Sequence, residues 1–201
     1  MNTILSAIGL PICAYLLGSI PFGLLIVLVL KKVDIRQVGS GNIGATNVKR
    51  AAGKKWALIT LICDVLKGFL PTYASVLLFS AAHHWVPSLT ALAAILGHMH
   101  PIYLKFKPSG KGVATTLGCL LPIAPLAGLI SLLAFLAAVF LSRRVSVGSL
   151  TGIFILPPAV WFTTQNPTVC AATIIVMVLI LVRHKDNIQR LANGCEPTIE
   201  D

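Results

Sequence analysis

Long apolar runs separated by short polar segments dominate this chain. A transmembrane helix needs about 20 consecutive apolar residues to cross a hydrocarbon core about 30 Å thick. In lipid every backbone N–H and C=O group has to be hydrogen-bonded internally, which leaves only helices and closed barrels. No segment has the alternating pattern of a barrel strand, so the sequence predicts an all-α integral membrane protein. The apolar runs cover residues 3–30, 56–80, 88–104, 113–141, 150–163 and 168–182.

The composition agrees with a membrane protein. Of 201 residues, 56% are hydrophobic and 11% are charged, and the mean hydropathy is +0.89, whereas a soluble domain has about 25% charged residues. A net charge of +10 is compatible with nucleic-acid binding, but the charges fill the gaps between apolar runs and form no basic domain. We therefore expect membrane lipid as a partner and no nucleic acid. The five cysteines show no CxxC motif and no Cys/His pairing, so we expect no disulfide and no metal site.

The positions of Lys and Arg predict the orientation. Cytoplasmic loops carry the excess of these residues, so we assign every basic segment to the cytoplasmic side. A single crossing by run 113–141 would place Arg143 and Arg144 outside. Pro122 and Pro125 interrupt this run, and two short helices would return the chain to the cytoplasm. The basic segments are 31–55, 105–112, Arg143 with Arg144, and the tail from Arg183.

These assignments predict about seven transmembrane or partly spanning helices in a single domain of residues 1–201, with the N-terminus outside and the C-terminus cytoplasmic. The run Thr3–Leu30 is too long for a cleaved signal peptide, and we expect it to remain as the first span. Runs 150–163 and 168–182 are too short to span fully alone, which implies local thinning of the bilayer.

The first basic segment has a composition suited to binding an anion. Glycines let the backbone approach an anion closely, and consecutive amides form concave anion sites. Arg50 can hold a phosphate with two hydrogen bonds. An ordinary polar loop between helices is the alternative interpretation. Three glycines (Gly39, Gly41, Gly44) alternate with Ser40, Asn42, Thr46 and Asn47.

A second cluster follows the third apolar run. Ser109-Gly-Lys111-Gly stands directly before a predicted helix start, where backbone amides and the helix dipole favour anions. The spacing is not that of a Walker A motif. His98 and His100 lack a third metal ligand nearby, so a structural hydrogen-bonding role is favoured over metal binding.

Two further clusters occupy the remaining basic segments. Ser149 follows Arg143 and Arg144 and either caps the next helix or donates to a ligand. His184 and Asn187 are three residues apart and would share one helix face. A basic tail after a last span is normally a topology anchor, but a His-x-x-Asn pattern is not needed for anchoring, which favours a functional role.

Ionisable residues also occur within and beside the second span. Asp64 and Lys67 are three residues apart, and either a functional role or a structural ion pair is consistent with this spacing. His83 and His84 lie on the opposite, uncharged side, where we expect no catalytic role.

The four clusters together indicate a phosphate ligand. The few carboxylates near them do not suit two-metal phosphoryl chemistry, and no Ser-His-Asp set or nucleophile elbow is visible. Residue chemistry alone therefore predicts a membrane protein that binds phosphorylated, lipid-like substrates at the cytoplasmic surface. A transporter or channel for an anionic metabolite and a scaffold for anionic head groups are the alternatives.

An ordered set of motifs, spread from Gly18 to Glu196, makes the interpretation more specific. Together these motifs closely resemble the bacterial acyl-phosphate:glycerol-3-phosphate acyltransferase family. Two departures are Ser109, where the family commonly has glycine, and Pro197, where a basic residue is common. The motifs are Gly18-Ser-Ile-Pro21, GSGNIGATN (39–47) with Arg50, Asp64-Val-Leu-Lys-Gly68, GHMHP (97–101), SGKGVAT (109–115), and RHKDNIQRL (183–191) with Glu196.

The resemblance implies an enzyme of the bacterial cytoplasmic membrane that needs no cofactor. It would transfer a fatty acyl group from acyl phosphate to the 1-hydroxyl of sn-glycerol 3-phosphate, giving lysophosphatidate and phosphate. Asn187 would donate to the oxyanion, and a substrate phosphate oxygen, or His184 as the alternative base, would take the hydroxyl proton. Ser40, Arg50, Lys111 and His184 would hold the phosphate of glycerol 3-phosphate, and Asn42, Thr46, Asn47 and Ser149, with glycine amides such as that of Gly41, would hold the acyl-phosphate head.

Overall fold

The protein is described here by a computed structural model, which covers residues 3–79 and 85–200. Within these residues all regular secondary structure is helical, as the sequence predicted, and His83 and His84 lie outside them. The elements are α1 (Thr3–Gly18), α2 (Phe22–Lys31), η1 (Ile35–Gln37), α3 (Ala45–Ala52), α4 (Lys54–Leu78), α5 (Trp85–Met99), η2 (Ile102–Leu104), α6 (Val113–Ile123), α7 (Pro125–Ser142), α8 (Val145–Thr164), α9 (Pro167–Arg183) and α10 (Lys185–Ala192).

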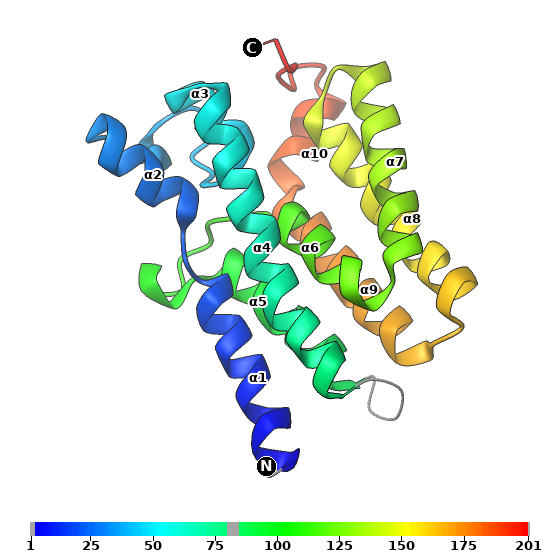
Figure 1. The fold of residues 1–201 in the computed structure, drawn as a ribbon. Coiled ribbons are helices and arrows are strands. Elements are labelled where there is room, and N and C mark those ends of the chain that lie inside the picture. The colour runs from blue at the N-terminus through cyan, green and yellow to red at the C-terminus, as the bar shows by residue number, and fades with distance from the viewer. Residues whose placement is uncertain (1–2, 80–84, 201) are drawn as a thin grey trace.

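Among the described residues, four segments are long and apolar enough to cross a membrane: Ser6–Lys31, α4, α7 and α8. The bent pair of α9 and α10, with an angle of 60°, would be a fifth. Helix α8 has 20 residues and a length of about 30 Å. The expectation that this segment is too short to span was therefore wrong, because the helix begins at Val145, well before the apolar run. The two termini lie at opposite ends of the bundle (Figure 1).

The predicted break in run 113–141 is present. Helix α6 ends at Ile123 and α7 begins at Pro125, with Ala124 between them in a non-helical conformation. Pro125 stands in the first turn of α7, where a missing N–H costs no helical hydrogen bond. The apolar run is thus divided into a short helix and an 18-residue helix.

The first apolar run, expected as a single span, is also interrupted. Helix α1 ends at Gly18 and α2 begins at Phe22. Pro21 has φ −88° and ψ 68°, and the Phe22 amide donates to the Ile20 carbonyl at 3.1 Å, which is the pattern of an inverse γ-turn. Figure 1 shows that α2 departs from the direction of α1 and runs toward the loop that precedes α3.

Helices α4 and α6 pack closely through a pair of glycines. A methyl group at Gly118 of α6 would lie 2.0 Å from the Val65 carbonyl oxygen, and one at Gly68 of α4 would lie 2.4 Å from the Thr115 carbonyl oxygen. Each glycine therefore faces the backbone of the other helix. Small residues at such positions let helix backbones approach each other in membranes, and here they set the distance between α4 and the helix that follows Lys111.

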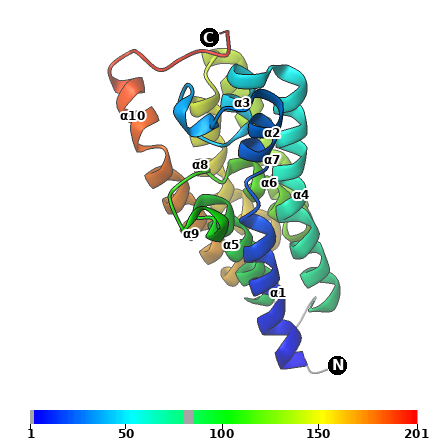
Figure 2. The same cartoon turned by 90° about the vertical axis from the view of Figure 1, so that its left-hand side faces the viewer.

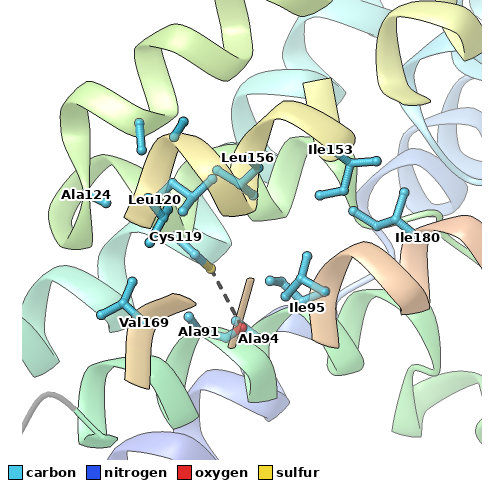
Figure 3. Packing of buried hydrophobic residues seen from close by; sticks show 14 of the residues in the cluster. Ala91, Ala94, Ile95, Cys119, Leu120, Ala124, Ile153, Leu156, Val169 and Ile180 are labelled. Carbon is cyan, nitrogen blue, oxygen red and sulfur yellow. Dashed lines mark hydrogen bonds between the residues drawn. The ribbon is translucent and has the colours of Figure 1, made fainter. Parts of the chain in front are cut away.

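The main apolar core lies among α5, α6, α8 and α9 (Figure 3). Cys119 is buried in this core, and its thiol faces the Ala91 carbonyl oxygen at 3.8 Å. The core joins the helices that carry the second and fourth clusters. Its buried members include Ala91, Ala94, Ile95, Cys119, Leu120, Ala124, Ile153, Leu156, Val169 and Ile180.

We predict that Gly118→Ala destabilises the fold. The added methyl group has to displace the α4 backbone, and overpacking of this kind costs about 1–3 kcal/mol. The midpoint of thermal unfolding in detergent should fall accordingly. Gly9→Ala is the matched control, since a methyl group at Gly9 of α1 meets no atom within 4 Å. Equal midpoints for the two variants would contradict the close approach of α4 and α6.

Candidate functional site

The segments that carry the predicted clusters lie in the half of the bundle away from the start of α1, with the loop between α5 and α6 nearer its middle (Figures 1 and 2). The Asn42 side-chain amide donates to the Ser109 carbonyl at 2.9 Å, which joins the first cluster to the second. Lys111 Nζ donates to Asn187 Oδ1 at 2.5 Å, which joins the second cluster to the fourth. Residues far apart in the sequence therefore form one polar site.

Asn47, in the first turn of α3, binds the loop of residues 38–44 that precedes this helix, which we call the first loop. Its buried side-chain amide donates to the carbonyls of Val38 and Asn42, each at 2.9 Å, and its Oδ1 accepts from the Ser40 amide at 3.1 Å. Gly39, with φ 56°, turns the chain directly beside this amide. The resemblance implied that Asn47 contacts acyl phosphate. In the structure both ends of its amide bind the loop backbone, so Asn47 shapes the loop, and its contact with acyl phosphate stays a prediction.

Other predicted residues of the first loop face outward. The side chains of Ser40, Thr46 and Arg50 are exposed, so their polar groups are accessible to a ligand. Gly41 has φ 68°, a left-handed conformation that favours glycine. Asn42 is half-buried and accepts from the Gly44 amide at 2.8 Å through Oδ1. Asn42 therefore braces this loop as well as linking it to the second loop.

The loop of residues 105–112 between η2 and α6, which we call the second loop, is hydrogen-bonded to the end of α5. The Ser109 amide donates to the Met99 carbonyl at 3.0 Å, and the Gly110 amide donates to the His98 carbonyl at 3.3 Å. Ser109 Oγ donates to the Lys107 carbonyl at 3.0 Å. This serine, which departs from the family pattern, thus stabilises the turn of its own loop. Helix α6 begins directly after the loop, as predicted.

Lys111 is the central cation of the site. Burial lowers the pKa of its ammonium group to about 8, against the opposing effect of the Glu196 carboxylate. Arg183 lies nearby and donates through Nε to the Gly110 carbonyl at 3.0 Å. Near neutral pH Lys111 is therefore a charged hydrogen-bond donor. Its loop is held by Arg183 and by the end of α5, which both bind the backbone of Gly110.

Asn187 is held between a cation and an anion. Its Oδ1 accepts from Lys111, and its Nδ2 donates to Glu196 Oε1 at 2.6 Å. Arg190 donates through Nε to the other carboxylate oxygen of Glu196 at 2.7 Å. Burial alone would raise the pKa of Glu196, but the polar side chains of Ser146, Asn187 and Arg190 hold this pKa below its ordinary value. The side chain of Asn187 is thereby fixed in one orientation.

Glu196 is a site residue that the residue chemistry did not select. The tail after α10 folds back, so that the Glu196 carboxylate reaches Asn187 while its carbonyl accepts from Arg144 Nε at 3.0 Å. Figure 2 shows this tail returning across the end of the bundle from α10. Glu196 belongs to the motif set that carries the family resemblance and stands close to a basic segment, but neither signal gave it a role, because the fold-back was not visible in the sequence.

His184 stands at the elbow between α9 and α10 and is buried. Its Nδ1 lies 2.9 Å from the Ile180 carbonyl oxygen. A ring nitrogen beside a carbonyl carries the proton, so the neutral imidazole has its free electron pair on Nε2. His184 is the N-cap residue of α10, and Asn187 lies in the first turn of this helix.

Ser149 differs from its prediction in part. Helix α8 begins at Val145, so Ser149 lies in its second turn and does not cap the helix. Its Oγ donates to the Val145 carbonyl at 2.9 Å, and the side chain is buried. The hydrogen bonds found among the described residues do not connect Ser149 with the other predicted site residues.

A groove of about 300 Å³ opens beside the first loop, between α3, α4, the start of α8 and the C-terminal tail. The tail forms one wall, because Lys49 Nζ donates to the Ile199 carbonyl and the Ile199 amide donates to the Arg143 carbonyl at 2.7 Å. Cations and apolar side chains share the lining, which suits an amphiphilic anion. The lining residues are Ala45, Thr46, Lys49, Arg50, Lys54, Ala57, Leu58, Leu61, Val145, Thr198 and Ile199.

The chain is similar in sequence and in structure to known glycerol-3-phosphate acyltransferases. Residues 8–194 match the family model described as glycerol-3-phosphate acyltransferase. A glycerol-3-phosphate acyltransferase of Syntrophotalea carbinolica is 45% identical over 92% of this chain and 93% of its own length. One from Aquifex aeolicus is 43% identical over 96% and 98%.

The structural similarity is equally extensive. A crystal structure of PlsY, an integral membrane glycerol 3-phosphate acyltransferase, in its glycerol 3-phosphate form, matches with a TM-score of 0.90 at 43% identity. It covers 96% of this chain and 95% of that chain. The lysophosphatidic acid form of PlsY matches with a TM-score of 0.87. By sequence and by fold, this chain belongs to the glycerol-3-phosphate acyltransferase family.

Proposed function

We propose that this protein transfers a fatty acyl group from acyl phosphate to the 1-hydroxyl of sn-glycerol 3-phosphate, with lysophosphatidate and inorganic phosphate as products. The observation that carries this proposal is the hydrogen bond from Lys111 to Asn187, which in turn binds Glu196 of the C-terminal tail. The same tail forms one wall of the cationic and apolar groove that Arg50 lines. Membership of an acyltransferase family does not favour the transporter alternative.

The phosphate of glycerol 3-phosphate would bind the charged part of the site. Lys111 is buried enough to interact strongly with an anion, and Arg50 is exposed at the groove. The amide of Gly41 and the small polar side chains around it suit the second phosphate, that of the acyl donor. We assign Ser40, Arg50, Lys111 and His184 to glycerol 3-phosphate, and Gly41, Asn42, Thr46, Asn47 and Ser149 to acyl phosphate, with Asn47 also shaping the loop.

The reaction needs no nucleophile from the protein, because acyl phosphate is already an activated mixed anhydride. The 1-hydroxyl oxygen attacks the acyl carbonyl carbon, the bond from that carbon to the phosphate oxygen breaks, and phosphate leaves with the bonding electrons. The hydroxyl proton passes to a phosphate oxygen of the substrate, with Nε2 of His184 as the alternative acceptor. The protein supplies orientation and a donor to the oxyanion, a role assigned to Asn187.

The acyl chain would lie in the apolar part of the groove. Leu58 and Leu61 of α4 line it and are themselves partly exposed on the outer surface of the bundle, at 57% and 41%. A lipid-soluble chain can therefore enter from the side while its phosphate stays among the cations at the rim, such as Lys54.

The basic end of the bundle would face the cytoplasm of a bacterium, across its cytoplasmic membrane. Excess Lys and Arg mark cytoplasmic loops, and the hydrogen-bonded site gathers the basic segments at one end. On this assignment the N-terminus is outside, the C-terminus is inside, and residues 1–201 act as one domain. The spanning or partly spanning elements would be α1 with α2, α4, α5, α6, α7, α8 and α9.

The proposed function is tested by phosphate release from the purified protein in detergent. Acyl phosphate is supplied with and without glycerol 3-phosphate, and no metal or coenzyme is added. We expect release that requires both substrates and lysophosphatidate in an equal amount. Saturable binding of glycerol 3-phosphate by folded protein without any turnover would instead support the transporter alternative.

We predict that activity declines as the pH rises above about 8. Burial lowers the pKa of Lys111 to about 8, and only the protonated ammonium attracts phosphate. Since kcat/KM reports ionisations of the free enzyme, kcat/KM for glycerol 3-phosphate should fall about tenfold per pH unit on the alkaline side. Lys111→Arg keeps its charge at every pH used, so its profile should lose this decline. The same decline in Lys111→Arg would assign the ionisation to another group.

We predict that Asn187→Ala lowers kcat by about 10²–10³-fold, with a smaller effect on KM for glycerol 3-phosphate, because the lost amide acts on the transition state. Asn187→Asp keeps the shape without the N–H and should lose a similar factor. Steady-state kinetics of both variants provide the measurement. Asn193→Ala, which removes an exposed amide at the end of α10, is the control. An effect confined to KM would refute the assigned role.

A further inference from the structure

Two opposite charges are buried in the middle of α4. Asp64 and Lys67 are 3% and 5% exposed, and Lys67 Nζ lies 2.8 Å from Asp64 Oδ1. The free energy lost by removing two charges from water commonly offsets their attraction, so a buried pair alone gives weak support for a purely stabilising role. Ionisable groups within membrane helices more often serve function. The neighbours of this pair are therefore informative.

Lys67 reaches the break between α1 and α2. Its Nζ donates to the Ile20 carbonyl at 3.0 Å and lies 5.7 Å from the centroid of the Phe22 ring. Pro21, between these two residues, has no N–H to donate, so helical hydrogen bonding is interrupted there. Lys67 supplies a donor at this interruption. It thereby fixes the start of α2, the helix that leads into the first loop of the site.

Asp64 faces the second loop through the imidazole of His98. Nδ1 of His98 lies 3.7 Å from Asp64 Oδ1 and has no hydrogen-bond partner, although the side chain is only 3% exposed. The other edge of the ring lies against Gly110, where a methyl group would be 2.0 Å from Nε2. The imidazole of His98 thus lies between the buried Asp64 carboxylate and the backbone of Gly110, the residue before Lys111.

We propose that Asp64, Lys67 and His98 are positioning residues for the acyl-transfer reaction, which set the two phosphate-binding loops relative to each other. Lys67 acts on the first loop through the α1–α2 break, and Asp64 acts on the second loop through His98 and Gly110. This inference rests on the proposed function, because it takes Lys111 as a ligand of the glycerol 3-phosphate phosphate. It resolves the choice that the sequence left open for the Asp64–Lys67 pair in favour of a functional role.

A double-mutant cycle read by equilibrium binding of glycerol 3-phosphate tests the inference. Asp64→Asn/Lys67→Met removes both charges together, so no unpaired charge is left in the bundle. We expect this pair variant to raise Kd about tenfold or more on its own and less than about twofold in the Lys111→Ala background, since residues that act through one another are not additive. In the steady state KM for glycerol 3-phosphate should change more than kcat.

Ser75→Ala is the matched control. Ser75 is buried on the same helix and is paired with Thr90 of α5 at 3.3 Å, so its loss perturbs the same helix pair without touching either loop. Its Kd should equal that of the wild type. Thermal unfolding is recorded for every variant, because a purely structural role would lower the unfolding midpoint without coupling to Lys111.

Equal fold-changes in Kd in both backgrounds, or an unchanged Kd, would overturn the inference. If the pair variant does not fold, His98→Gln carries the same cycle with the same expectation and the same overturning result. Phosphate release by the wild-type protein is measured in parallel. Coupling to Lys111 without acyl transfer would support a positioning role in glycerol 3-phosphate binding but refute the proposed function. Acyl transfer with additive effects on Kd would support the proposed function but refute the positioning role.

Discussion

The organisation of the site depends on a series of hydrogen bonds that joins the side chains of Lys111, Asn187 and Glu196. Each of these three side chains comes from a different part of the fold: the loop before α6, the first turn of α10, and the tail beyond α10. Because the amide of Asn187 donates to the carboxylate and accepts from the ammonium group, it cannot flip without losing both contacts. The three side chains therefore have one arrangement, and the second loop, α10 and the tail are fixed together.

Helix packing brings Lys111, Asn187 and Glu196 close to one another. The close approach of α4 and α6 through Gly68 and Gly118 sets the position of the helix that begins just after Lys111. The apolar core joins α5, α6, α8 and α9, and so fixes the end of α9 from which α10 turns away by 60°. Small shifts of these helices would change the hydrogen-bond distances among Lys111, Asn187 and Glu196. The polar site is thus a consequence of apolar packing some distance away from it.

Sequence patterns predicted the helical membrane fold, the break between Pro122 and Pro125 and the clusters that meet, because hydropathy and proline chemistry act locally. Contacts that depend on tertiary folding were less accessible. The start of α8 at Val145 was missed because the run beside it is basic, which in turn made Ser149 a candidate cap. The roles of Asn47 and Glu196 depend on tertiary contacts, since Asn47 faces loop carbonyls and the Glu196 carboxylate faces the side chains of Asn187 and Arg190. Sequence reasoning therefore found the family and the segments that form the polar site, but not the contacts of the residues that hold these segments in place.

The balance of charge explains why neutral amides and glycines accompany the cations. A phosphate monoester carries a charge of about −1.5 to −2 near neutral pH, so bringing two such groups together needs several positive charges that are not already neutralised. The Glu196 carboxylate at the centre of the site is shared by Asn187 and Arg190, and the salt bridges among the described residues do not include Lys111. The burial that lowers the pKa of Lys111 strengthens its attraction for an anion. Orientation by an amide, instead of by a carboxylate, thus keeps the positive charge available for the substrates.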